Sequence, residues 1–444
     1  MSNDLLPMTG DIPWVPRNED GTFAGACFAP FHRDIVTIGL VPGDLVLLRY
    51  ANCYTALNLF FYCIRQGWVP CFIPPDLPSQ RVRTLALAFG AKVLFTAHLP
   101  PQLAEVGAQV VETPLCLVLV FEAGPRLTRA GEVVVTTSGT SGSESACVLG
   151  FESMLLNARR HARAVGLQQQ DRVLVLLPIH YSYGLVAQVL AAVECGAGLM
   201  LGTPSIGKLV NIVPEGTTCL SLTPFLLRRL LADSAEPFPS SLRILTIGGD
   251  FTPPGQVVDL RRRYPKLGIY LTYGLTEAGP RVSTLAAHIE PPSRYGSVGL
   301  PLEGTRVRLS GAEDALPAGE LLVYSDTLMR RHLGAPRPSP WTPKGELRTG
   351  DLFEFVEGYM YWRGRLSDIV VRGGEKVNLA SIGRDALRVP GVSYARAAMV
   401  NGELQLELQC VTPPRDLKRQ LSRLLRPVER PDRVIVTGHR RGYK

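Results

Sequence analysis

The chain has 444 residues, of which 46% are hydrophobic and 19% charged, and its formal net charge is +8. This length exceeds one ordinary core, so we expect two or three domains. Residues 361–444 carry the positive charge, with 17 lysines and arginines against 8 aspartates and glutamates. This basic end predicts an acidic or phosphorylated partner. Since there is no aromatic-rich basic motif or helix-turn-helix pattern, we expect no nucleic-acid partner.

The nine cysteines are scattered and none forms a CxxC pair, which argues against a disulfide framework and favours a reducing cytosol. The opening residues MSNDLLPMTGD show no basic region followed by an apolar core, so we expect no export signal. The most apolar long stretch, residues 173–201, is interrupted by Pro178, His180 and Glu194. We therefore expect no membrane span and a cytoplasmic protein.

Apolar runs typical of buried strands alternate along the chain with amphipathic segments typical of helices. The first such units occupy residues 45–50, 52–67 and 69–73, followed by 83–90 and 91–97. The rhythm returns at residues 172–178, 184–196 and 197–201, and again at 242–250, 253–265 and 268–274. It predicts an α/β fold with parallel sheets and helices on both faces.

The pattern changes from about Gly319, where short strands separated by turns are expected at residues 319–326 and 351–365. After Arg365 the sequence predicts a small α/β unit with strands, one helix at residues 379–390 and a basic helix at 415–427. We therefore place a boundary at Gly364–Arg365. It divides the chain into a large domain, residues 1–364, and a small domain, residues 365–444.

The segment VVVTTSGTSGSES, residues 133–145, passes from an apolar strand into a loop of small polar residues. Hydroxyls and exposed backbone amides of such a loop can hold phosphate oxygens without a side-chain charge. The order is wrong for a Walker loop, and a polar surface turn remains an alternative. The candidate residues are Thr137, Ser138, Gly139, Thr140, Ser141 and Gly142.

The segment LTYGLTEAGP, residues 271–280, follows a further apolar run. The ring of Tyr273 can stack on a base, the Thr276 hydroxyl can meet a phosphate, and Glu277 can hold Mg²⁺. A helix start, with Thr276 as its cap, is the structural alternative. Further along, Asp351 is a plausible acceptor for ribose hydroxyls and Arg365 a donor, although a turn and a surface ion pair would explain them too.

The loop at 137–142, then YGLTE, GELLV, RTGDL and GRLSD, resemble in their order the motifs of the acyl-adenylate-forming superfamily. This superfamily comprises acyl-CoA synthetases, firefly luciferase and the adenylation domains of nonribosomal peptide synthetases. The likeness extends from about Gly39 to the C-terminus. It implies a large N-terminal domain with parallel-rich sheets, flanking helices and a small barrel-like part, followed by a small mobile C-terminal α/β domain.

The resemblance also implies roles for individual residues. The loop Thr137 to Gly142 would hold the phosphates of ATP, and Gly248, Gly249 and Asp250 would line the nucleotide and acyl pockets. Tyr273, followed by Gly274, would stack on adenine.

In the same comparison, Thr276 would contact the α-phosphate and Glu277 would bind Mg²⁺. Asp351 would hold the ribose hydroxyls, with Arg365 beside it.

This sequence departs from the family at several positions. After the phosphate loop, Glu144, Ser145 and Ala146 replace the usual proline, lysine and glycine, so positive charge there must come from Mg²⁺ or binding is weaker. At the hinge between domains the family has aspartate or lysine where this chain has Ser367.

The family also carries a lysine near its C-terminus, after a glycine. Lys444 is the candidate for this catalytic role, although Arg440, Arg441 or no residue at all are alternatives.

The segment LPIHYSYGL aligns with the family's LPLFHSYGL. Tyr181 then takes the place of the gating histidine, and His180 falls one position earlier, as expected of a packed or turn histidine. Members that activate amino acids carry an aspartate at the next position, where this chain has Ser182. Because a buried ammonium without a partner is costly, we expect an acid that lacks an α-amino group there.

Together these motifs predict a ligase that activates a carboxylic acid with ATP and Mg²⁺ as an acyl-AMP. The acyl group would then pass to a thiol of coenzyme A or of an acidic acyl carrier protein. An amide-forming ligase of the same fold, or a degenerate binding protein without catalysis, are the alternatives.

Overall fold

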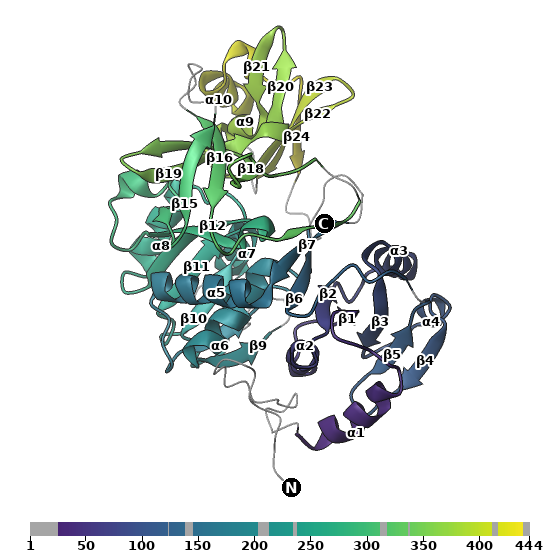
Figure 1. The fold of residues 1–444 in the computed structure, drawn as a ribbon. Helices are drawn as coiled ribbons and strands as arrows, with labels where there is room; N and C mark the ends of the chain where they lie inside the picture. The colour runs from purple at the N-terminus through teal and green to yellow at the C-terminus, as the bar shows by residue number, and fades with distance from the viewer. Residues whose placement is uncertain are drawn as a thin grey trace.

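The computed structural model describes residues 25–122, 124–137, 145–202, 213–233, 238–310, 318–335, 338–410 and 416–437. Within these ranges the chain forms two large sheets, a smaller antiparallel sheet and, in the C-terminal part, two further small sheets (Figure 1). No helix in these ranges is both long and apolar enough to cross a membrane.

The first large sheet has the strand order β17-β7-β6-β2-β1-β3-β5-β4. Its strands are β1 (Leu45–Arg49), β2 (Val69–Ile73), β3 (Ala91–Thr96), β4 (Gln109–Glu112), β5 (Leu117–Val120), β6 (Glu132–Thr136), β7 (Ser145–Gly150) and β17 (Arg331–Gly334). β1 pairs in parallel with β2 and β3, and the connections run through helices α2 (Tyr54–Arg65) and α3 (Ser79–Phe89). The first four residues of β1 are buried, as the continuous apolar run predicts for a strand covered on both faces.

The second large sheet has the strand order β14-β13-β12-β11-β10-β8-β9. Its strands are β8 (Arg172–Val175), β9 (Gly198–Leu201), β10 (Cys219–Leu222), β11 (Ile244–Gly248), β12 (Gly268–Gly274), β13 (Arg281–Ala286) and β14 (Leu300–Pro301). β9, β8, β10, β11 and β12 run parallel, so their carboxyl ends meet at one edge. Helices α7 (Pro224–Asp233) and α8 (Pro254–Arg263) connect β10, β11 and β12.

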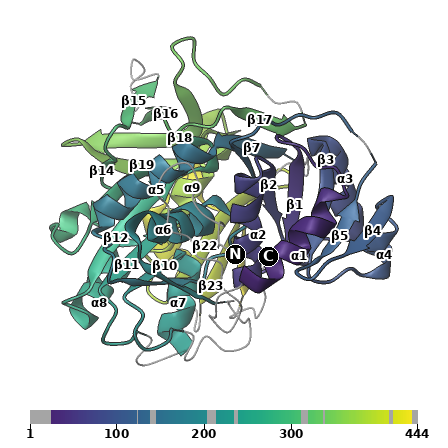
Figure 2. The same ribbon diagram turned by 60° about the horizontal axis from the view of Figure 1, so that its bottom comes forward.

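Helix α5 (Phe151–Val165) joins the two large sheets by contacting β7 of the first and β13 of the second. Figure 2 shows α5 and α6 (Ala191–Cys195) between the two groups of strands. The π-helix η1 (Tyr183–Leu190) precedes α6 and contacts α5. π-helical turns are rare and are frequent at functional sites.

The next sheet is antiparallel, in the order β15-β16-β18-β19. Its strands are β15 (Arg306–Ser310), β16 (Gly319–Tyr324), β18 (Leu347–Val356) and β19 (Tyr359–Arg365). This sheet occupies the place for which the sequence predicts a small barrel-like part.

The C-terminal part follows η4 (Leu366–Asp368), which contains Ser367. Its elements are β20 (Ile369–Arg372), β21 (Glu375–Asn378), α9 (Leu379–Ala386), β22 (Val392–Val400), β23 (Glu403–Cys410), α10 (Leu417–Leu424), η5 (Pro427–Glu429) and β24 (Arg433–Thr437). A separate cluster of buried apolar side chains from these elements, among them Ile382, Leu406 and Leu421, forms a core of its own.

The predicted fold class is confirmed: an α/β chain with large sheets, flanking helices and a smaller α/β unit at its C-terminal end. Several elements lay outside the expectations from the sequence, among them α1 (Gly25–Val36), α4 (Pro101–Ala104), α5, α7, β4, β5, β10, β13, η3 (Pro292–Arg294) and β24. The sequence offered a helix start at Thr276 only as an alternative, and the short helix η2 (Thr276–Ala278) lies there, with Leu275 at the cap position. The boundary at 364/365 falls one residue before the end of β19, which η4 follows directly, and it stays a prediction.

Candidate active site

A cavity of about 270 Å³ lies at the carboxyl edge of β11 and β12, where loops of an α/β sheet commonly hold ligands. We call it the strand-end cavity. Six residues that the sequence predicts to be site residues line this cavity. Phe251 and Trp362, which the sequence did not predict, line it too. The six are Gly249, Asp250, Tyr273, Gly274, Asp351 and Arg365.

Asp351 is the most buried acid of this cavity, with 2% of its surface exposed. The Tyr273 hydroxyl donates a hydrogen bond to its Oδ2 at 2.7 Å, and Arg365 Nε donates to its Oδ1 at 3.0 Å. Asp351 and Arg365 face each other as register partners on β18 and β19, which explains why residues 14 apart in sequence meet. The carboxylate partner of this ion pair, Asp351, is therefore buried rather than at the surface.

Burial has the largest effect on the ionisation of the Asp351 carboxyl. It raises the pKa of Asp351 above its ordinary value, and the neighbouring Arg365 charge acts in the opposite direction. Burial, followed by the nearby carboxylate of Asp351, also raises the pKa of Tyr273 well above its ordinary value. Tyr273 thus stays a neutral hydrogen-bond donor over the whole physiological range.

Two glycines bring backbone close to the cavity. A Cβ on Gly248 would lie 2.4 Å from the Thr272 hydroxyl, and a Cβ on Gly274 would lie 2.1 Å from the Pro280 carbonyl oxygen. Only glycine avoids these collisions, so both positions depend on the absent side chain. Gly248 itself ends β11 and adjoins the lining residues Gly249 and Asp250.

Two residues nominated for different roles meet directly at this edge. The hydroxyls of Ser182 and Thr276 lie 2.9 Å apart, in hydrogen-bond contact, although 94 residues separate them. Ser182 is 7% exposed and precedes η1, while Thr276 begins η2. Glu277 follows in η2, and its backbone carbonyl accepts a hydrogen bond from Met329 N.

The residues before Ser182 are less enclosed. The Tyr181 side chain is 45% exposed, and the His180 ring lies against it with 4.3 Å between ring centroids. Burial lowers the pKa of His180 to about 4, so it is neutral at pH 7. These contacts agree with a packed His180.

One end of the predicted phosphate loop is described. Thr137 N donates to the Ser145 carbonyl at 3.2 Å, and the two side-chain hydroxyls lie 2.9 Å apart. Ser138, Gly139, Thr140, Ser141 and Gly142 lie outside the described residues, as does Lys444.

Trp362 and Phe251 stack with 6.4 Å between ring centroids, and Arg384 of α9 lies over both rings. In the sequence, Trp362 stands in the aromatic cluster YMYWRGR, and Phe251 directly follows the GGD turn. These two patterns could have identified both residues as site candidates. The sequence also assigned no role to a third residue, Arg281, which directly follows TEAGP. A charged residue at the start of an apolar strand was the signal that could have found it.

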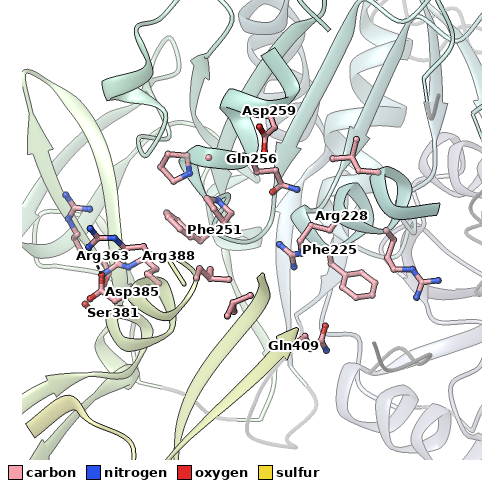
Figure 3. Close-up of a pocket in the computed structure, with 18 residues that line it drawn as sticks. Phe225, Arg228, Phe251, Gln256, Asp259, Arg363, Ser381, Asp385, Arg388 and Gln409 are labelled. Carbon is pink, nitrogen blue, oxygen red and sulfur yellow. Dashed lines mark hydrogen bonds and ion pairs between the residues drawn. The ribbon is translucent and has the colours of Figure 1, made fainter. Parts of the chain in front are cut away.

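A larger cavity of about 1180 Å³, the arginine cleft, lies between α7 and α8 on one side and α9 and β23 on the other (Figure 3). Phe251 lines both cavities. Five arginines and two aspartates line the cleft, which gives it an excess of positive charge. The arginines are Arg228, Arg229, Arg363, Arg384 and Arg388.

These features define a class of protein: a two-sheet α/β domain with a cavity at its strand ends, followed by a small C-terminal α/β unit. The chain belongs to the AMP-binding enzyme family, whose model matches residues 35–333. The predicted membership of the acyl-adenylate-forming superfamily is thereby confirmed.

Among curated proteins, the sulfoacetate–CoA ligase of Cupriavidus necator is 30% identical over 283 residues. The match covers 61% of this chain and 54% of that ligase, so the chain spans about half the length of that relative.

Two solved structures of o-succinylbenzoate CoA synthetase from Bacillus subtilis share the fold. The complex with the acyl-adenylate intermediate has a TM-score of 0.80 at 22% identity and covers 95% of this chain and 90% of its own. The complex with ATP and a magnesium ion has a TM-score of 0.77 at 21% identity and covers 93% and 89%. At these identities the likeness establishes the fold alone.

Proposed function

We propose that this protein activates a carboxylic acid with ATP and Mg²⁺ as an acyl-AMP and then transfers the acyl group to a thiol. The observation that carries this proposal is the strand-end cavity, where Tyr273, Asp351 and Arg365 meet beside the Ser182–Thr276 pair. Family membership and the sulfoacetate–CoA ligase relative support it.

The cavity has the donors and acceptors that an adenosine needs. A carboxylate offers about four acceptor sites, and Tyr273 and Arg365 donate to two of those on Asp351. The Trp362 side chain donates to the same carboxylate. Asp351 therefore keeps capacity for a ribose hydroxyl. Tyr273, Phe251 and Trp362 supply aromatic surface for the base.

Thr276 and Glu277 would act at the phosphates. The Ser182 contact fixes the Thr276 hydroxyl, which would then donate to a non-bridging oxygen of the α-phosphate. Glu277 would hold Mg²⁺, which neutralises phosphate charge during displacement of pyrophosphate.

Magnesium commonly binds through one or two carboxylates plus phosphate oxygens. That mode fits this chain, because the described residues contain no cluster of three or more histidines, cysteines or acids that could hold a metal by themselves.

The arginine cleft suits a phosphorylated thiol. Coenzyme A and the phosphopantetheine arm of an acidic carrier protein both carry a thiol and phosphate, and guanidinium groups bind phosphate well. We propose either of them as the acceptor. Eight cysteines whose side chains the structure describes are free thiols, which supports a reducing, cytoplasmic setting.

The acid substrate would lack an α-amino group near Ser182. A serine hydroxyl cannot neutralise an ammonium ion, and Ser182 is already engaged with Thr276. A buried ammonium without a carboxylate partner would cost several kcal/mol, roughly.

The test is acid-dependent exchange of labelled pyrophosphate into ATP, with a broad panel of carboxylic acids. Exchange with at least one acid is the expected result, and product analysis with coenzyme A, a carrier protein and an amine then identifies the acceptor. Absence of exchange across the panel, in protein that still unfolds cooperatively, would contradict an adenylating function and favour a binding role.

A further inference from the structure

Arg281 stands at the first position of β13, opposite Gly274 of β12 in the strand register. Only 3% of its surface is exposed. Asn157 of α5 holds its backbone from both sides: Asn157 Nδ2 donates to the Arg281 carbonyl, and Arg281 N donates to Asn157 Oδ1, each at 2.9 Å. The position of this arginine is therefore set by the packing of α5 against the sheet.

Neutral groups hold its guanidinium. Nη1 donates to the Thr272 hydroxyl at 3.0 Å, and Cζ lies 4.2 Å from the centroid of the Tyr183 ring. Nε has no hydrogen-bond partner in the part of the chain that the structure describes. Among the described residues, no aspartate or glutamate forms an ion pair with Arg281.

An unpaired buried charge is expensive, by several kcal/mol as a rough figure, and proteins rarely keep one without a use. Burial lowers the pKa of Arg281 from its ordinary value, while Tyr183 and Tyr273 act in the opposite direction. The neighbouring His161, 1% exposed, cannot supply a negative charge, and burial together with Arg281 lowers its pKa to about 3.

The guanidinium lies at the edge of the site. Nη1 is 3.4 Å from the point where a Cβ on Gly248 would stand, and Nη2 is 3.0 Å from the corresponding point at Gly274. Gly248 ends β11, and the residues that follow it line the strand-end cavity; Gly274, the last residue of β12, lines that cavity itself. Tyr183, beneath the guanidinium, directly follows Ser182.

Arg281 bonds Thr272 and adjoins Gly274, and both of these residues line the strand-end cavity. Side chains alternate along β12, so Thr272, which holds Arg281, points away from the face on which Tyr273 bonds Asp351.

Adenosine is neutral, and Thr276 and Mg²⁺ at Glu277 would hold the phosphates of ATP. The anion that pairs with Arg281 would therefore come from the acid. A tight ion pair would weaken the reacting carboxylate as a nucleophile, which leaves a second anionic group of the acid as the partner.

We propose that Arg281 is a specificity-determining residue that binds a second anionic group, a carboxylate or sulfonate, on the acid substrate. This inference rests on the proposed adenylation. The substrate class is then an acid with two negative charges, one group reacting and the other held by Arg281.

Matched acids test the proposal in the pyrophosphate-exchange assay. The pairs are benzoate with isophthalate, and propionate with 3-sulfopropionate, each giving a kcat/KM ratio of dianion to monoanion. A hydrogen bond to a charged group predicts a ratio above one that falls about 10- to 100-fold in Arg281→Met and less in Arg281→Lys. Arg262→Met removes the charge of an 82% exposed arginine and should leave the ratio unchanged.

A second measurement does not depend on the variant. In wild-type protein, isophthalate or 3-sulfopropionate should raise the melting temperature more than the matched monoanion at equal concentration. The same dianions should lose this advantage in Arg281→Met, if that variant folds.

The outcomes separate the two proposals. Exchange with monoanions but no preference for either dianion, or an equal loss for both members of a pair in Arg281→Met, overturns the role of Arg281 and leaves adenylation standing. No exchange with any acid overturns adenylation, and the substrate class falls with it.

Discussion

The hydroxyl of Tyr273 donates to the carboxylate of Asp351 at 2.7 Å, across 78 residues of sequence. This bond joins β12 of the second large sheet to β18 of the antiparallel sheet. The motifs predict that Tyr273 stacks on the base and that Asp351 holds the ribose. The hydrogen bond joins these two residues directly. Both residues line the strand-end cavity.

Asp351→Asn should weaken ATP binding by about 10- to 100-fold, because the amide replaces a charged acceptor with one acceptor and one donor. The KM for ATP in pyrophosphate exchange measures the effect. Tyr273→Phe, which removes only one neutral donor, should cost less, up to about 10-fold. Equal ATP affinity in Asp351→Asn and wild type would remove Asp351 from the ribose site.

Glu277→Gln should lower adenylation by about 100-fold or more and shift the Mg²⁺ dependence to higher concentration, since the metal loses its charged ligand. A magnesium titration of exchange activity measures both effects. Glu303→Gln is the matched control, because the Glu303 side chain is 74% exposed and bonds only weakly to Arg163 at 3.4 Å. Wild-type turnover in Glu277→Gln would show that the metal lies elsewhere.

Ser182→Ala should slow exchange by up to about 10-fold, because it removes one neutral hydrogen bond that orients the Thr276 hydroxyl. Thr276→Ala should lose more, since the hydroxyl itself is absent. In the double variant the two effects should not add, as expected for residues in direct contact. Fully additive losses would mean that the two hydroxyls act independently.

Arg388→Ala should raise the KM for coenzyme A or carrier protein more than it affects pyrophosphate exchange. Arg388 lines the arginine cleft and its side chain is 69% exposed, so it is accessible to a phosphate. Comparing thioester formation with exchange separates the two half-reactions. Arg419→Ala, an exposed arginine of α10 that does not line the cleft, is the control. An equal rise in KM for both variants would indicate a diffuse charge effect only.

Stability should fall as the pH drops below 6.5, owing to His161. Its folded-state pKa is about 3 against an ordinary 6.5, so below pH 6.5 the unfolded chain binds a proton that the folded chain does not. The contribution lost between pH 7.5 and 5 is about 2 kcal/mol. Chemical denaturation of wild type and His161→Gln measures it, with a flatter pH dependence expected in the variant. Parallel curves for the two proteins would contradict a buried neutral His161. His180, whose pKa falls to about 4, acts in the same direction in both proteins.

The sequence by itself determined the fold class, the main alternating strand and helix units, and the selection of Gly249, Asp250, Tyr273 and Asp351 as candidate site residues. These depend on local information: apolar periodicity, turn residues and motifs of contiguous residues. Phosphate contacts at Ser138 to Gly142 and the role of Lys444 remain predictions, since these residues lie outside the described ranges.

Only the tertiary structure decided which nominated residues meet. The Ser182–Thr276 contact joins loops 94 residues apart, and it exists because the carboxyl ends of parallel strands share one edge. The sequence likewise could not reveal the setting of the Arg281 charge, because its burial, and the lack of a carboxylate partner among the described residues, are properties of its surroundings. Motifs specify residue types along the chain, whereas contact, burial and electrostatic cost arise only when distant segments pack together.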